Sequence, residues 1–160
     1  MFKYLIILFL FFMSASFAQD KYFEMVRADF KADKVNYITE AMNLSDQEST
    51  KFWPLYREYD LKLSKIGDEM YLLIKDYAQN YNNIDNKKAE EIISKLFDLK
   101  QRSLDLKKEY FGTISEALSP VIAAKFIQIE NEIDNFINVQ INAQLPLIGE
   151  DSINTETEKK

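Results

Sequence analysis

The sequence predicts an all-α protein, and three observations support this fold class. Only three Gly and three Pro occur among the 160 residues. No long stretch alternates apolar and polar residues, as a half-buried strand would. Apolar residues instead recur at steps of three and four in four segments, which is the period of an amphipathic helix. We expect four helices, two of which form a long antiparallel hairpin (about 46–81 and 87–117).

The first predicted helix covers about residues 22–42. Its apolar spacing is loose before Asp33 and regular after it, so the second half carries the stronger helical signal. The apolar residues of this segment are Phe23, Val26, Phe30, Val35, Ile38 and Met42.

The second helix begins at Ser45, whose hydroxyl can cap the first backbone N–H groups while Glu48 reaches back, as in a capping box. Pro54 lies inside the pattern, where it removes an N–H and crowds the carbonyl of Thr50. Because the apolar pattern continues beyond Pro54, we expect the helix to bend there and not to stop. Its apolar stripe contains Phe52, Leu55, Tyr56, Tyr59, Leu63, Ile66, Met70, Leu73 and Tyr77.

An Asn-rich turn at 80–86 separates the second helix from the third, since Asn and Asp compete with helical hydrogen bonds. The third helix has the stripe Ile92, Leu96, Leu99, Leu106, Tyr110 and Ile114.

The fourth helix begins at Ser119-Pro120, an N-cap residue followed by proline at the first helical position. It continues to about Ala143 and ends before Pro146. Its apolar face holds Ile122, Phe126, Ile129, Ile133, Phe136 and Ile137.

Two long helices with two shorter ones favour an elongated fold over a compact four-helix bundle. Such a fold leaves apolar surface that a second subunit can cover, so we expect a homodimer.

The N-terminus has the layout of a signal peptide. Lys3 precedes an apolar run of about ten residues, too short for a bilayer span of roughly twenty. Small residues at Ser16 and Ala18 match a cleavage site, so we expect residues 1–18 to be removed and the protein to be periplasmic, without stable membrane insertion. The alternative is an uncleaved N-terminal anchor. The remaining chain divides into a single helical domain (19–145) and a disordered polar tail (146–160).

Composition excludes several classes of function. The chain has no Cys and no His, so it lacks the usual ligands of transition metals and the usual nucleophile–His pairs. Removing residues 1–18 takes away Lys3 and moves the net charge from −6 to −7, which disfavours binding to nucleic acid. We therefore expect no cofactor, no metal site, no nucleic-acid partner and no enzymatic activity.

Two short segments share a pattern at a predicted helix start. Leu44 and Leu118 each precede a capping serine and stand eight residues before a phenylalanine. Leu-Ser before a helix is also ordinary capping. The two segments hold, at equivalent positions, Leu44, Ser45 and Glu48, and Leu118, Ser119 and Ile122.

With these segments and the run Phe52-Trp53-Pro54-Leu55-Tyr56, residues 33–143 resemble the Spy/CpxP family of periplasmic stress proteins. That family carries two Leu-Thr-x-x-Gln motifs at helix starts in an all-α hairpin fold. Here serine replaces threonine, and Glu48 and Ile122 stand in place of glutamine, so neither motif is intact. The resemblance implies ATP-independent binding of unfolding proteins or restraint of an envelope-stress sensor.

The second helix is rich in aromatic residues, which suit unspecific protein contacts. The candidates for client binding are Phe52, Trp53, Tyr56 and Tyr59, and core packing is the alternative. A client surface that combines apolar and basic groups would need the basic residues on one face. The candidates are Lys62, Lys65, Arg102, Lys107 and Lys108.

The carboxylates of the last two helices have a plainer interpretation as solvating groups on exposed faces. These are Glu109, Glu130, Glu132 and Asp134.

Three functions remain after these exclusions. The first is a chaperone or stress adaptor that binds unfolded proteins, and the second is a regulatory partner that restrains a membrane stress sensor or anti-sigma system. The third and most remote is an exported all-α enzyme such as a chorismate mutase. Such a site needs several converging cations, and the chain has only three arginines.

Overall fold

The computed structural model describes residues 33–143, 145 and 147, and all secondary structure in this part of the chain is helical. This confirms the all-α prediction. The chain divides into two units, residues 1–43 and 44–160, which are described separately. The predicted signal peptide (1–18) and most of the polar tail (146–160) lie outside the described residues.

In the first unit, residues 33–42 are helical, which agrees with the more regular half of the first predicted helix. Asn43 ends this helix with a φ of 45°, in the left-handed region that asparagine tolerates better than most residues. Its N–H donates a 3.3 Å hydrogen bond to the carbonyl of Thr39.

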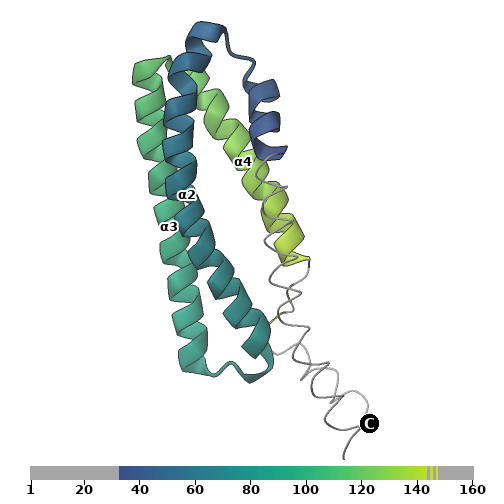
Figure 1. The fold of residues 1–160 in the computed structure, drawn as a ribbon. Coiled ribbons are helices and arrows are strands. Elements are labelled where there is room, and N and C mark those ends of the chain that lie inside the picture. Colours follow the sequence, from purple (N-terminus) through teal and green to yellow (C-terminus); the bar gives the residue numbers. More distant parts are fainter. Residues whose placement is uncertain (1–32, 144, 146, 148–160) are drawn as a thin grey trace, which may run out of the picture. The chain divides into compact units, whose positions relative to one another are not determined.

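The second unit contains α2 (Asp46–Asn80), the 3₁₀ turn η1 (Tyr81–Asn83), α3 (Asn86–Ala117) and α4 (Pro120–Asn142). Figure 1 shows α2 and α3 side by side and antiparallel, and their extensive contacts form the predicted hairpin. The boundaries of these helices lie within about one residue of the predicted ones. The agreement is close because each helix starts at a strong N-cap. At 35 residues, α2 is about 50 Å long.

Proline does not end α2. The helix continues through Pro54, as the apolar pattern predicted. The bend expected there remains a prediction.

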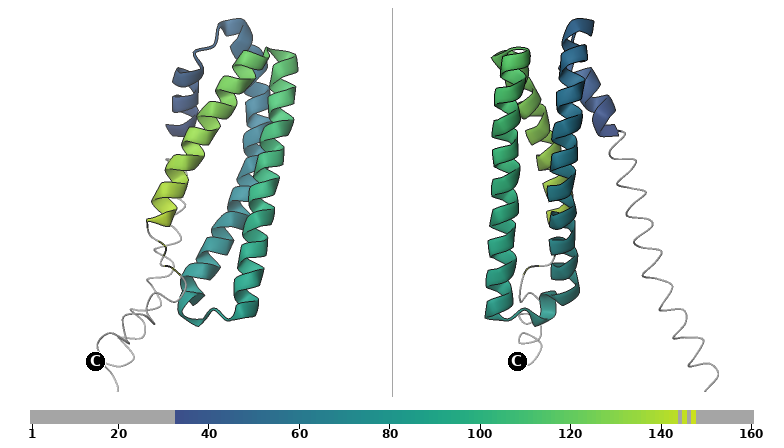
Figure 2. Two further views of the ribbon diagram at one scale, coloured as in Figure 1. Left: turned by 180° about the vertical axis from the view of Figure 1, so that it is seen from behind. Right: turned by 60° about the vertical axis from the view of Figure 1, so that its left-hand side comes forward.

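The second unit has two packed regions along the hairpin. At one end α4 lies against both α2 and α3, and the views of Figures 1 and 2 show it diverging from the hairpin toward its own C-terminus. The core of this end consists of Phe52, Tyr56, Tyr59, Leu106, Tyr110, Ile114, Ala123, Phe126, Ile129 and Ile133.

The other end of the hairpin is packed by α2 and α3 themselves. Leu73, Ile92 and Leu99 form a buried cluster there, with Ile66, Met70, Tyr77, Ile84 and Leu96 packed against it. Two helices can bury only the stripes that face each other, so the outer sides of this end remain exposed to solvent. Among the described residues, no helix combines the length and apolar character needed to cross a membrane.

Candidate functional site

The two Leu-Ser segments are N-caps in the structure. The Ser45 hydroxyl accepts from the Glu48 N–H, and the Glu48 carboxylate accepts a 2.8 Å hydrogen bond from the Ser45 N–H, which completes the predicted capping box. The Ser119 hydroxyl accepts from the Ile122 N–H at 3.2 Å. Hydrogen bonding to Ser45 also lowers the pKa of Glu48. Leu44 and Leu118 are half-buried beside these caps, so this constellation begins helices and has no evident chemistry of its own.

The aromatic residues considered for client binding lie mostly in the core, which was the alternative to client binding. Phe52 and Tyr59 have no exposed area, and Tyr56 is 2% exposed. Their rings meet Phe126 of α4 at centroid distances of 5.8 Å for Phe52 and 5.1 Å for Tyr59. The physical reason is that α4 covers this end of α2, so the alternative of core packing applies to these three.

Trp53 is the one member of that set with partial exposure. Its ring packs edge-on against Phe52 and Tyr56, with both centroid distances at 5.4 Å. The aromatic core therefore extends through Trp53 to the protein surface.

Glu130 is fully buried, which corrects its assignment to a solvating face. Its Oε2 accepts a 3.0 Å hydrogen bond from the Tyr59 hydroxyl. Burial, followed by the nearby Glu130 carboxylate, raises the pKa of Tyr59 far above its usual range, so the hydroxyl stays protonated as a donor. Of the other three carboxylates, Glu109 and Glu132 are exposed and Asp134 is half-buried.

Basic residues are only partly gathered on one face. Lys62, Lys65 and Arg102 line an open groove of about 360 Å³ between α2 and α3, together with Ile66, Asp105, Leu106 and Glu109. Lys107 lies elsewhere: it is 9% exposed, and its ammonium donates to Asn131 and Asp134 on α4. Lys108 is exposed and pairs with Asp105 at 3.2 Å.

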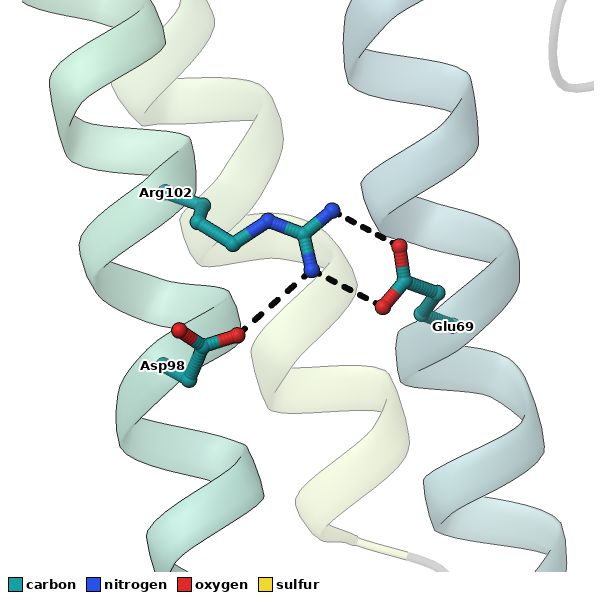
Figure 3. A network of polar contacts seen from close by, with 3 residues as sticks. All are labelled: Glu69, Asp98 and Arg102. Atoms are coloured by element: carbon teal, nitrogen blue, oxygen red, sulfur yellow. Dashed lines mark hydrogen bonds and ion pairs between the residues drawn. The ribbon is translucent and has the colours of Figure 1, made fainter.

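Arg102 joins the two long helices across this groove (Figure 3). Its two terminal nitrogens donate to the two carboxylate oxygens of Glu69 on α2, at 2.8 and 2.7 Å, and one of them lies 3.5 Å from Asp98 on α3. This bidentate geometry is specific to a planar guanidinium. Hydrogen bonding to Arg102 lowers the pKa of Glu69 below its usual value of 4.5.

Lys62 is held in a similar way. Its ammonium donates to Glu109 at 2.9 Å, lies 3.4 Å from Glu58, and sits 5.0 Å from the centre of the Tyr110 ring. Hydrogen bonds to Glu109 and Tyr110 raise the pKa of Lys62. Since two of the three groove cations are engaged by carboxylates, the groove is a poor site for a small anion.

An exposed apolar stripe on α3 is the feature that the sequence reasoning missed. It consists of Ile93, Phe97, Leu104 and Phe111, all exposed, with Phe97 at 65%. Steps of four, seven and seven residues place them along one side of the helix, beside the buried stripe. The seven-residue spacing of Phe97, Leu104 and Phe111 was visible in the sequence. Apolar residues at this interval form the contact seam of a coiled coil.

Chemistry needing a metal or a cluster of cations finds no support in the described part of the chain. No group of three or more Asp and Glu side chains there could hold a metal ion. Arg57 and Arg102 are both exposed, so they form no buried cationic pocket of the kind a chorismate mutase would need. The third arginine, Arg27, lies outside the described residues.

Comparison with known proteins adds no further information on the site. No family model, no curated protein and no solved structure matches this chain.

Proposed function

We propose that the chain is a periplasmic, ATP-independent chaperone or envelope-stress adaptor that binds unfolded proteins on the outer faces of the α2–α3 hairpin. The observation that carries the proposal is the exposed apolar surface of this hairpin. Leu61 and Leu72 on α2 are 61% and 59% exposed, and the α3 stripe is exposed along much of its helix. A row of exposed apolar side chains along one helix, such as the α3 stripe, offers a surface that can bind another protein.

The charges around these apolar residues suit a polypeptide better than a small ligand. Small-molecule sites are concave and mostly apolar, with a few polar groups free to contact the ligand. The groove between α2 and α3 is open, and its Arg102 and Lys62 are engaged by carboxylates. A long, shallow surface of apolar and charged side chains can instead contact a bound polypeptide along several turns of α2 or α3.

Two features of the sequence support an extracytoplasmic setting. Residues 1–18 have the layout of a signal peptide, and the caps at Ser45 and Ser119 resemble the helix starts of the Spy/CpxP family. Such a compartment supplies no ATP, so a chaperone there must work by binding alone.

The proposal is tested by an aggregation assay with several unrelated unfolding substrates. The purified chain should suppress their aggregation at a near-stoichiometric ratio. The double variant Phe97→Ser and Leu104→Ser should suppress it less, while the matched control Val121→Ser, at a 78% exposed position on α4, should act like the parent chain. All three positions are exposed, so we expect circular dichroism to show an unchanged fold in both variants.

Two outcomes would contradict the proposal. Suppression unchanged in the double variant would remove the α3 stripe from the mechanism. No suppression with any substrate, combined with capture of a single membrane protein, would favour the regulatory partner that restrains a membrane stress sensor or anti-sigma system.

A further inference from the structure

The α3 stripe carries cations on both of its flanks. Lys100 and Lys108 lie on either side of the row formed by Phe97, Leu104 and Phe111, at helix positions three or four residues from its members. Both lysines are exposed. The stripe from Phe97 to Phe111 is therefore an apolar row with a lysine on each border, over the middle of α3.

Lys100 in particular is available to a partner. Among the described residues, no carboxylate oxygen lies within 4.0 Å of its ammonium. Lys108 pairs with Asp105, but with side chains 63% and 58% exposed this pair is weakly held and can be exchanged for another carboxylate.

A second copy of this chain is a poor occupant of the stripe. The borders of a second stripe carry the same two lysines, Lys100 and Lys108. Two borders of the same charge attract each other less than a lysine border and a carboxylate border do.

We propose that the α3 stripe binds an acidic amphipathic helix of a partner protein. The seven-residue spacing of Phe97, Leu104 and Phe111 matches a helix whose apolar side chains repeat at the same interval. Carboxylates on the borders of that helix would reach Lys100 and Lys108. From Phe97 to Phe111 the stripe is about 20 Å long, so the partner helix needs about four turns. This inference rests on the proposed function and adds the chemical class of the bound segment.

The test uses two fluorescent peptides of about eighteen residues, each long enough for four to five turns. Both carry leucines at heptad spacing, with glutamates on the borders in one and lysines in the other. Binding to the purified chain is followed by fluorescence anisotropy at low ionic strength, where exposed charges are least screened. The acidic peptide should bind at least about tenfold more tightly than the basic one.

Matched variants locate the binding site. Lys100→Glu should abolish or reverse the preference for the acidic peptide, and Phe97→Ser should weaken its binding by about tenfold, as loss of an apolar anchor does. Lys87→Glu, also on α3 and 84% exposed, controls for charge reversal, and Leu61→Ser on α2 controls for loss of an exposed apolar side chain. Neither control should change binding.

Equal affinity for the two peptides would overturn the inference. It would also be overturned if the controls Lys87→Glu and Leu61→Ser lost as much peptide affinity as Lys100→Glu and Phe97→Ser. If Phe97→Ser converts a dimer to a monomer in sedimentation velocity, a second copy covers the stripe and the inference is wrong. Suppression of aggregation without preference for the acidic peptide would refute this inference alone and leave the proposed function standing.

Discussion

The hydroxyl of Tyr59 on α2 donates a 3.0 Å hydrogen bond to Oε2 of Glu130 on α4, and neither residue has exposed area. This contact places a polar pair within the aromatic core formed where α4 covers the hairpin. Buried polar groups are costly unless they are hydrogen-bonded, so such a pair fixes one register of α4 against α2. That register also places Phe126 against Tyr59.

Tyr59→Phe removes this donor while keeping the ring. We expect the free energy of unfolding to fall by about 1–3 kcal/mol, the range for leaving a buried hydrogen-bonding group unsatisfied. Urea denaturation followed by circular dichroism measures it.

The same substitution in a Glu130→Gln background should cost less, because the tyrosine then loses a hydrogen bond to a neutral acceptor. An equal cost in both backgrounds would show that the charge of Glu130 does not strengthen the contact.

Phe126 is the apolar anchor of α4. It is fully buried, and its ring contacts Phe52, Tyr56 and Tyr59. Phe126→Ala should lower the free energy of unfolding by about 3–5 kcal/mol, through lost burial and the cavity left behind. Phe136→Ala on the same helix, where the side chain is 60% exposed, should change it by less than about 1 kcal/mol. Similar effects at the two positions in denaturant titrations would contradict the packing of α4.

Neighbouring lysines on α3 should differ in their contribution to stability. The Lys107 side chain is 11% exposed and bonds to Asn131 and Asp134, whereas that of Lys108 is 63% exposed and pairs locally with Asp105. Lys107→Ala leaves Asp134 without its ammonium partner.

The Lys107 substitution should cost about 1–3 kcal/mol, less than a fully buried pair because the Asp134 side chain is 35% exposed. Lys108→Ala should cost less than about 1 kcal/mol. Thermal unfolding of both variants measures the difference, and equal shifts would refute the distinction.

The helices could be predicted from the sequence because their local signals agree with the final packing. Ser45 and Ser119 each cap the helix that follows, and the apolar period continues across Pro54. Asp85, predicted as part of the turn, caps α3 in the structure. Helix ends are set by contacts a few residues apart, so one sequence suffices to find them.

The surface could not be predicted in the same way, since exposure depends on which helix covers which stripe. Phe52, Tyr56 and Tyr59 are buried because α4 packs on them, and Glu130 is buried on the opposing helix. Phe97 and Leu104 have the same apolar character, but they lie beside the buried stripe of α3 and remain exposed. Periodicity assigns residues to helix faces, but only the tertiary arrangement says which faces are covered.

The Arg102–Glu69 pair should make a contribution to stability that depends on pH. The Arg102 guanidinium lowers the pKa of Glu69 below the usual 4.5. The pair therefore contributes its full stabilisation of the fold above pH 4.5. The contribution is lost as pH falls through the lowered pKa and Glu69 becomes protonated. Arg102→Ala should therefore lower the Tm at about pH 7, and this effect should shrink as the pH falls through the lowered pKa of Glu69, because the parent chain then also loses the pair.

Arg102→Lys provides the control for charge. It keeps the positive charge but loses the bidentate hydrogen bonds to Glu69. At neutral pH its Tm should lie between those of the parent chain and Arg102→Ala. The Tm difference between the parent chain and Arg102→Ala could instead stay the same across this pH range. The Arg102 side chain would then act by packing along the groove, and not through its pairing with Glu69.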